Sequence, residues 1–293
     1  MKKLFPFAFT LLFLALLFYF IPIEDLLKSL QKINPLNLIL AFLSYSLSQL
    51  FRTLRWKILI KDLPFFHLFL INSANIMFNN LLPARTGELS WFYYLKQLKV
   101  NLSLSLWTFF IGRLYDLFSL LFLLFLSLAF LKVIMLLPSL MLFIFALSLP
   151  WLYFIIPPFG KLKDLKVFIK NETSFKLVSM IFSLSLLSTT TKFVSLLLLL
   201  DLGHVSLYKS FLAFLGGELS SVLPIHSFMG FGTYELAFGL PLKVIGESLK
   251  EWLKLGFLFH NFLLISSLVW GVPSALILST KRFLKHNQKN IEP

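Results

Sequence analysis

The sequence contains no cysteine and few charged residues. With no cysteine among 293 residues, disulfides, thiolate metal sites and cysteine nucleophiles are excluded. Asp, Glu, Lys and Arg make up only 14% of the chain, whereas hydrophobic residues make up 58% and the mean hydropathy is +0.85. Soluble domains do not have such a balance, and several segments reach the roughly 20 apolar residues that span a bilayer. We therefore predict an all-α, polytopic integral membrane protein.

The motifs of several familiar catalytic sites are also absent. The sequence has no Walker A loop, zincin helix, serine nucleophile elbow or Rossmann glycine pattern. This argues against an ATP-driven pump in a single chain, and we predict neither a cofactor nor a metal site. The apolar run at residues 4–23 follows two lysines, as in a signal peptide, but it is too long and no small-residue cleavage site follows it. We expect an uncleaved first span.

Acidic residues are scarce relative to basic ones, so the formal net charge is +14. The basic residues lie mostly in short loops and tails, where they act as topogenic signals and contact anionic head groups. We therefore predict that these charges face a membrane surface and not nucleic acid. The positive-inside rule places both termini, including a basic tail at residues 281–293, in the cytoplasm. A plasma (inner) membrane protein is the predicted localisation.

The apolar runs predict about six spans and two broken hairpins, or about eight membrane segments, in a single membrane domain covering residues 1–293. The spans are expected at residues 4–23, 35–51, 102–131, 134–156, 177–200 and 252–278. The hairpins are expected at residues 65–95 and 208–240. Basic residues flank the first hairpin on both sides, so both of its ends are predicted on one side of the membrane. This element is therefore predicted to be re-entrant.

The tip of the first hairpin combines helix breakers with charge. Pro83 and Gly87 interrupt the apolar run, and Arg85 and Glu88 lie between and beside them. A break in the hydrocarbon is tolerated only where protein or a water-filled cavity satisfies the freed backbone groups. Each charge costs about 2.5–3.5 kcal/mol at a helix centre on insertion scales. We predict that Arg85 contacts a phosphate while Glu88 balances charge or carries a proton; the alternative is a local, self-neutralising ion pair.

The second hairpin is interrupted in a similar way, by Pro224, Gly230 and Gly232, which we expect to shape its tip. The two tips occupy corresponding positions in two halves of the chain, residues 1–132 and 133–280. Since the first half begins inside and the second outside, the halves are predicted to form an inverted-topology repeat. Interrupted segments at matching positions of two halves indicate the substrate site of a transporter near the bilayer midplane.

Glu218 and Glu235 flank the second tip, and the hairpin arms hold no Arg or Lys close in sequence to either of them. Acids at membrane depth need partners or altered protonation, so Arg85 or Arg113 of the other half is the expected partner. Proton coupling and a solvated rim position are the alternatives. His226 aligns with Arg85 when the tips are compared, which makes it a second phosphate contact or a satisfied polar residue.

Two further charged groups lie within or just after predicted spans. Arg113 and Asp116 are three residues apart and share a helix face, where they either staple the span to the hairpin or contact substrate. Arg52 and Arg55 follow residues 35–51 and are expected at the cytoplasmic mouth, either as topogenic charges or as head-group contacts. Trp56 beside them suits an interfacial anchor.

These residues together resemble a known family. The motifs are N-x-L-P-x-R-x-G-E from Asn80 to Glu88, R-x-x-D from Arg113, L-P…G-x-G-x-x-E from Leu223 to Glu235, and R-x-x-R-W from Arg52. In this order they resemble the lysylphosphatidylglycerol synthase transmembrane family, the flippase-like domain also found at the N-terminus of multiple peptide resistance factor proteins. The resemblance covers essentially the whole chain. Departures are Trp91, where the family often has an Arg, and the string HSFMGFG at the second tip.

The resemblance implies a lipid translocase that moves phospholipid or lipid-linked phosphate head groups between leaflets. Its expected partner is an anionic phospholipid or a polyprenyl phosphate. In the resistance factors a separate soluble domain attaches lysine to phosphatidylglycerol; here only a short tail follows Leu278, so that activity is not carried over. One alternative is a membrane enzyme acting on a polyprenyl or lipid phosphate, with Mg²⁺ held through the phosphate by Glu88 and Asp116. Another is a partner subunit of a cell-envelope lipid synthase.

Overall fold

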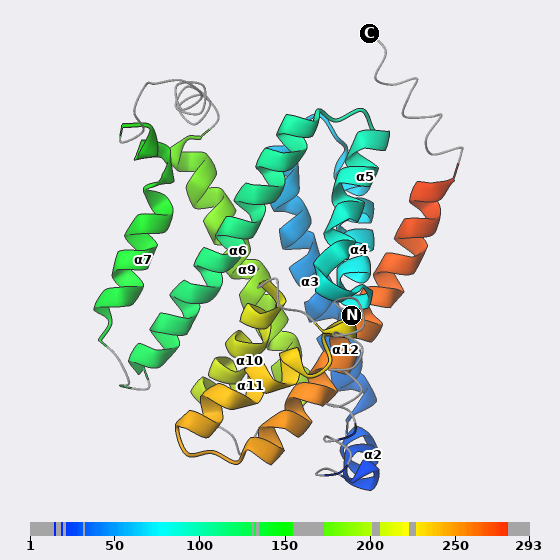
Figure 1. The fold of residues 1–293 in the computed structure, drawn as a ribbon, viewed down its shortest axis with the longest axis vertical. Helices are drawn as coiled ribbons and strands as arrows, with labels where there is room; N and C mark the ends of the chain where they lie inside the picture. Colours follow the sequence, from blue (N-terminus) through cyan, green and yellow to red (C-terminus); the bar gives the residue numbers. More distant parts are fainter. Residues whose placement is uncertain are drawn as a thin grey trace, which may run out of the picture.

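The regular structure consists of helices throughout the part of the chain that the computed structural model describes. The described residues are 15, 19, 22–31, 33–130, 132, 135–154, 173–200, 206–222 and 227–280. The predicted first span and the basic tail at residues 281–293 therefore lie almost entirely outside them. Figure 1 shows the long helices side by side, with α7 at one edge of the bundle and two shorter helical hairpins entering from its opposite ends.

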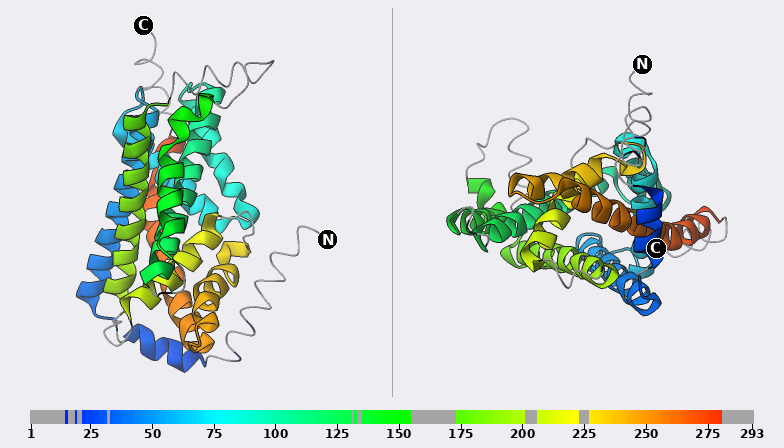
Figure 2. Two further views of the ribbon diagram at one scale, coloured as in Figure 1. Left: turned by 90° about the vertical axis from the view of Figure 1, so that its left-hand side faces the viewer. Right: turned by 90° about the horizontal axis from the view of Figure 1, so that it is seen from below.

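The first described helices are α2 (Ile23–Gln31) and α3 (Pro35–Leu59). Helix α2 occupies the segment between the first two predicted spans and lies across the end of the bundle (Figure 2, left). Helix α3 begins where Asn34 caps it, since the Asn34 side chain accepts from the backbone N–H of Leu36 and Pro35 fits the first turn. It continues eight residues past the expected end at residue 51, because partners inside the bundle satisfy the polar residues of its last turns.

The first hairpin consists of α4 (Phe65–Leu81), the 3₁₀ turn η1 (Pro83–Glu88) and α5 (Leu89–Gln97). Leu82 is extended, as expected for a residue before proline, and this ends α4. The turn then folds back so closely that a Cβ on Gly87 would lie 2.2 Å from the carbonyl carbon of Phe78. Only glycine fits this approach of the backbone.

The middle of the chain forms α6 (Leu102–Phe130), α7 (Leu137–Leu147) with the 3₁₀ turn η2 (Leu149–Phe154), and α9 (Phe175–Leu199). Helix α6 closely matches the predicted span. The apolar run expected to give one span at residues 134–156 instead gives the short helix α7 and a separate turn. Helix α7 packs against both α6 and α9.

The second hairpin consists of α10 (Leu207–Val222), the turn η3 (Phe228–Gly230) and α11 (Thr233–Val244), and α12 (Leu249–Ser279) follows. Gly230 and Gly232 have φ of 78° and 92°, in the left-handed region that favours glycine, so both shape this tip. The other predicted tip residues, Pro224 and His226, lie outside the described residues.

The contacts between helices relate the two halves. Helix α3 packs along α9, α4 packs against α12, and α10 packs against α6. The turns η1 and η3 meet, so the two hairpin tips lie together in the middle of the bundle (Figure 1). An internal repeat would produce this exchange of contacts. The inverted repeat itself, the count of six spans and the re-entrance of the hairpins stay predictions.

Three described helices are long and apolar enough to cross a membrane by length and composition: α6, α9 and α12. Trp56, expected at a membrane interface, is instead buried at 5% exposure among α3, α4 and α5. Its ring packs on Trp91 with centroids 4.4 Å apart, and its Nε1 donates to Asn72 Oδ1 at 3.1 Å. A Cβ on Gly112 of α6 would lie 2.2 Å from an atom of the Trp56 indole ring. The indole can therefore occupy this position only because residue 112 has no side chain.

Candidate functional site

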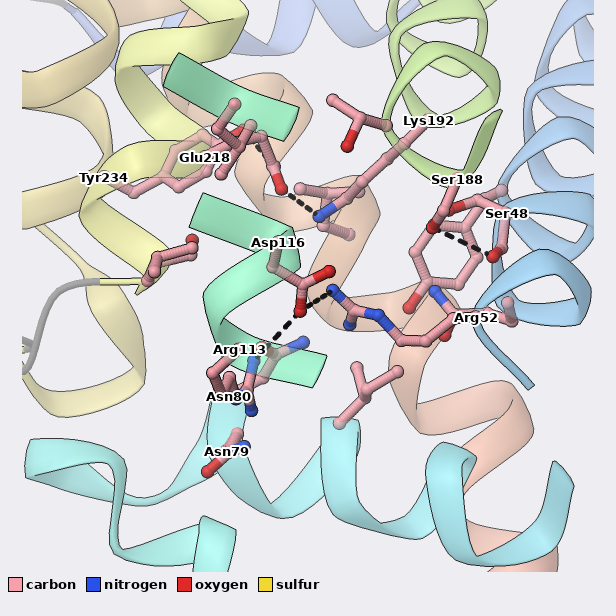
Figure 3. Close-up of a pocket in the computed structure, with 18 of the residues that line it drawn as sticks. Ser48, Arg52, Asn79, Asn80, Arg113, Asp116, Ser188, Lys192, Glu218 and Tyr234 are labelled. Atoms are coloured by element: carbon pink, nitrogen blue, oxygen red, sulfur yellow. Dashed lines mark hydrogen bonds and ion pairs between the residues drawn. The ribbon is translucent and has the colours of Figure 1, made fainter. Parts of the chain in front are cut away.

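A polar cavity lies where the two hairpin tips meet the long helices. About 970 Å³ of empty space lies between its walls, a volume that includes the part open to solvent. Its walls come from α3, α4, η1, α6, α9, α10, α11 and α12, so both halves of the chain contribute. Figure 3 shows ionic side chains pointing into it from opposite walls. Its ionisable lining residues other than tyrosine are Arg52, Arg85, Arg113, Asp116, Lys192, Glu218 and His260.

Asp116 of α6 is the centre of an arginine cluster. Both of its oxygens accept from Arg55, at 2.5 and 3.2 Å, and Oδ2 also accepts from Arg52 at 3.5 Å. Arg113 Nη1 lies 3.8 Å from the same oxygen, and Figure 3 shows Asp116 between Arg52 and Arg113. Arg55 is fully buried and also donates to Ser185 on α9 at 2.6 Å. Arg55 is therefore a structural partner inside the bundle and not a residue at its mouth, whereas Arg52 reaches the cavity.

Glu88 links the first tip to the same cluster. Its Oε1 lies 2.6 Å from Arg85 Nη2 and 3.0 Å from Arg113 Nη2. The predicted local pair between Arg85 and Glu88 thus exists, and Arg113 extends it to α6. Arg85 has a φ of 56°, a left-handed conformation uncommon outside glycine and characteristic of functional sites. The structure brings Arg85, Glu88, Arg113 and Asp116 together as one network; their contact with substrate stays a prediction.

Glu218 of α10 faces this cluster from the second half. Its Oε2 accepts from Lys192 Nζ of α9 at 2.8 Å, and its Oε1 accepts from the Tyr234 hydroxyl of α11 at 3.3 Å. The expected pairing of Glu218 with Arg85 or Arg113 of the first half is therefore wrong. Lys192 of the long helix α9 neutralises it within the same half, and α9 lies outside the hairpin arms.

Glu235 of α11 is completely buried and also has its partner in the second half. Its Oε1 lies 2.6 Å from His260 Nδ1 of α12, and its Oε2 accepts from the backbone N–H of Gly232 at 2.7 Å. The pairing expected with an arginine of the first half is again wrong. Glu235 holds the second tip and connects it to His260, which lines the cavity.

The side chains around the cavity include buried polar atoms without a partner and carry a surplus of positive charge. The Nε atoms of Arg52 and Arg113 and the Oδ1 of Asn79 are buried and have no hydrogen-bond partner among the described residues. With Arg55 and Glu88, which complete the networks, five basic side chains face three carboxylates, Glu88, Asp116 and Glu218. Buried charge is costly unless it is paired. The arrangement therefore suits an anionic ligand with several acceptor oxygens.

Several lining residues were not predicted from the sequence. Lys192 and His260 each interrupt a long apolar helix, and isolated ionisable residues at such positions signal function. The sequence therefore contained a signal for both residues, although neither was among the predicted site residues. The hydroxyls of Ser48 on α3 and Ser188 on α9 are 3.1 Å apart. Their sequence positions carry no such signal, because serine is common in helices whether or not they line a functional site.

The described residues contain no cluster of three His, Asp or Glu side chains arranged to hold a metal ion. Both carboxylates of the arginine cluster, Glu88 and Asp116, are already engaged by guanidinium groups. Arginine is the residue type whose planar guanidinium matches carboxylate and phosphate oxygens in a bidentate way, so the cluster has the chemistry of an oxyanion site.

Comparison with known proteins gives one family match. The family model described as lysylphosphatidylglycerol synthase TM region matches residues 4–271. This match covers both hairpins, the arginine cluster and the Lys192–Glu218 pair. No curated protein and no solved structure matches the chain.

Proposed function

Because the chain belongs to the lysylphosphatidylglycerol synthase TM region family, an integral membrane family with a lipid-related function, we propose that it moves lipids with a phosphate-bearing head group between the leaflets of a membrane. The observation that carries this proposal is the cavity itself: it is polar, has surplus positive charge and lies where the two broken hairpins meet. In the proposal the membrane is the plasma membrane, with both termini in the cytoplasm. The substrate is an anionic phospholipid or a polyprenyl phosphate.

The physical difficulty in lipid translocation is the head group, since an isolated charge placed in hydrocarbon costs tens of kcal/mol by Born solvation. In the proposed mechanism the cavity replaces water around the phosphate, while the acyl chains remain in lipid. Arg52 and Arg113 are placed to receive it because both line the cavity and both already pair with carboxylate oxygens there. Arg85 approaches from the first tip and Lys192 from the opposite wall.

Release of the phosphate requires that it does not bind too tightly. Arg113 lies between Glu88 at 3.0 Å and Asp116 at 3.8 Å, so internal carboxylates compete with the phosphate for the same guanidinium. An arriving phosphate exchanges one set of ion pairs for another instead of meeting bare charges. We infer that this exchange keeps binding weak enough for passage, as conduction through a selective pore also requires.

The same contacts bear on the rival enzyme hypothesis. An enzyme that binds Mg²⁺ and phosphate needs carboxylate oxygens available to the metal. Here each candidate carboxylate, Glu88 and Asp116, contacts at least two arginines. This engagement favours translocation of the intact lipid over chemistry on it.

The test is leaflet exchange of fluorescent phosphatidylglycerol and of a polyprenyl phosphate in liposomes that contain the purified protein. We expect exchange by the wild type and a loss of roughly tenfold or more in Arg113→Ala, because a hydrogen bond to a charged group contributes about 1.5–3 kcal/mol. Lys250→Ala, which removes an exposed charge from α12 outside the cavity, is the matched control and should exchange lipid normally. No exchange of either lipid by folded wild-type protein, with or without a pH gradient, rejects the proposal.

A further inference from the structure

The cavity walls carry matched polar residues at equal positions of matched helices. Helices α3 and α9 both have 25 residues. Ser48 and Ser188 are each the fourteenth residue, and their hydroxyls contact each other at 3.1 Å. Arg52 and Lys192 are each the eighteenth, and both bind a carboxylate beside the cavity, Asp116 and Glu218 respectively. The two walls are therefore related in position and in the type of pair they hold.

The same relation holds for the hairpin tips. Arg113 is the twelfth residue of α6, and His260 is the twelfth residue of α12. Each binds the glutamate at the end of the tip in its own half: Arg113 contacts Glu88 at 3.0 Å, and His260 contacts Glu235 at 2.6 Å. A pair of a helix cation and a tip carboxylate thus occurs twice around one cavity.

The two pairs differ in one chemical respect. Arginine keeps its charge at any accessible pH, whereas histidine gains and loses a proton near neutrality. We propose that the His260–Glu235 pair is a proton-binding site, and that binding of this proton is coupled to passage of the lipid head group through the cavity. This inference rests on the proposed translocase function and adds the coupling ion.

The geometry supplies a route for the coupling. His260 lines the cavity, and Glu235, its partner, holds the backbone N–H of Gly232 at the positive-φ bend of the second tip. With the proton bound, the pair is an imidazolium and a carboxylate; when it leaves through the imidazole to the cavity, Glu235 keeps a fully buried charge without a cation. Because that state is costly, proton loss favours a different arrangement of the tip.

Other ionisable side chains surround this pair. Tyr234 stacks on the His260 ring with centroids 4.7 Å apart, and its hydroxyl donates to Glu218, which accepts from Lys192. Tyr45 of α3 lines the same cavity, as do Arg52, Arg85, Arg113 and Asp116 on the opposite side. None of these side chains is a histidine, the residue type whose charge ordinarily changes between pH 5 and 8. Histidine is thus the residue type at this site suited to respond within that range.

The first experiment measures exchange of a fluorescent polyprenyl phosphate in liposomes at a series of pH values, with a pH-sensitive dye enclosed. For the wild type we expect the exchange rate to change roughly threefold or more between about pH 5.5 and 8, and lipid movement to be accompanied by proton movement. His260→Gln and His260→Arg should abolish this pH response. His67→Gln, which removes a histidine of α4 outside the cavity lining, should retain it.

The outcomes separate this inference from the proposed function. Wild-type protein that moves no lipid defeats the proposed function. Wild-type protein that moves lipid at one rate across the pH range, with no proton movement, overturns the inference alone. A pH response that survives His260→Gln and disappears in Glu218→Gln also overturns it, because the site is then Glu218.

A second measurement follows proton binding directly and does not require lipid transport. Calorimetric titration of the wild type with polyprenyl phosphate, in two buffers of different ionisation enthalpy, gives the number of protons taken up on binding. The same titration is repeated with His260→Gln, or with Glu235→Gln if the first variant does not fold. Subtracting the proton uptake of the variant from that of the wild type removes the contribution of the lipid phosphate's own protonation. We expect uptake that the substitution removes; equal uptake in wild type and variant overturns the inference.

Discussion

Two carboxylates beside the cavity each pair with more than one arginine, so the loss of one carboxylate affects several charges at once. Asp116 contacts Arg52, Arg55 and Arg113, whereas Glu88 contacts Arg85 and Arg113. Arg55 depends on Asp116 more than the other arginines do. It is fully buried, and among the described residues Asp116 is the carboxylate that neutralises its charge. Removal of a carboxylate therefore affects stability as well as substrate binding.

Asp116→Asn should lower the stability of the folded protein strongly. The substitution keeps the shape of the side chain but leaves Arg55 as a buried, uncompensated charge, and breaking a buried ion pair in this way costs about 3–5 kcal/mol. The measurement is the thermal unfolding midpoint in detergent. Asp62→Asn changes an exposed aspartate and serves as control; equal midpoints for the two variants contradict the role given to Asp116.

Lys192→Ala should slow lipid exchange severalfold with a smaller effect on folding. Lys192 is partly exposed to the cavity, and Glu218 retains the Tyr234 hydroxyl as a donor after the substitution. Leaflet exchange in liposomes measures the effect. Lys176→Ala, at the exposed start of the same helix, is the comparison variant. If both variants exchange lipid at the wild-type rate, Lys192 plays no part in translocation.

The hairpins could be predicted from the sequence because their breaks are local. Pro83 and Gly87 interrupt an apolar run, and the described structure breaks there and refolds as a 3₁₀ turn. The partners of Glu218 and Glu235 could not be predicted in this way. Their ion pairs join residues 26 and 25 positions apart, and helix packing selects Lys192 and His260 over the arginines of the other half. Burial of Trp56 likewise depends on the absence of a side chain at Gly112, which no local pattern reveals.

Gly87→Ala should disturb the first tip. The added methyl group would lie 2.2–2.4 Å from backbone atoms of Phe78 and Asn79, which cannot move without displacing the end of α4. Overpacking of this kind costs about 1–3 kcal/mol, and the displaced tip should reduce lipid exchange. At Gly256 the nearest atoms belong to the Phe238 side chain at 3.1 Å, so Gly256→Ala should be milder. The reverse order of effects in unfolding and exchange contradicts the packing described here.

The contact between α3 and α9 can be tested because the chain has no native cysteine. Replacing Ser48 and Ser188 together by cysteine should give a disulfide within the chain under mild oxidation, since the two hydroxyls are 3.1 Å apart. Faster migration on a non-reducing gel detects it. Leu47→Cys with Ser188→Cys is the control pair, because Leu47 is exposed on the neighbouring face of α3. Equal cross-linking of both pairs contradicts the helix packing.

At the scale of the whole molecule, the two halves contribute different chemistry to one cavity. The first half supplies arginines and the second supplies Lys192, Glu218 and the His260–Glu235 pair. Matched helices surround the cavity, and the tips enter it from opposite ends of the bundle (Figures 1 and 2). Such an arrangement suits a fixed central site that opens to one leaflet at a time.

The most direct test of this account is whether a lipid phosphate occupies the cavity from either side. In the cysteine-free chain, Asn80→Cys introduces one thiol into the cavity lining. We predict that a membrane-impermeant thiol reagent modifies it from both sides of the membrane, and that polyprenyl phosphate slows the reaction whereas the uncharged polyprenol does not. Modification that the phosphate lipid does not slow, in protein shown to be folded, would contradict a cavity that carries the head group between leaflets.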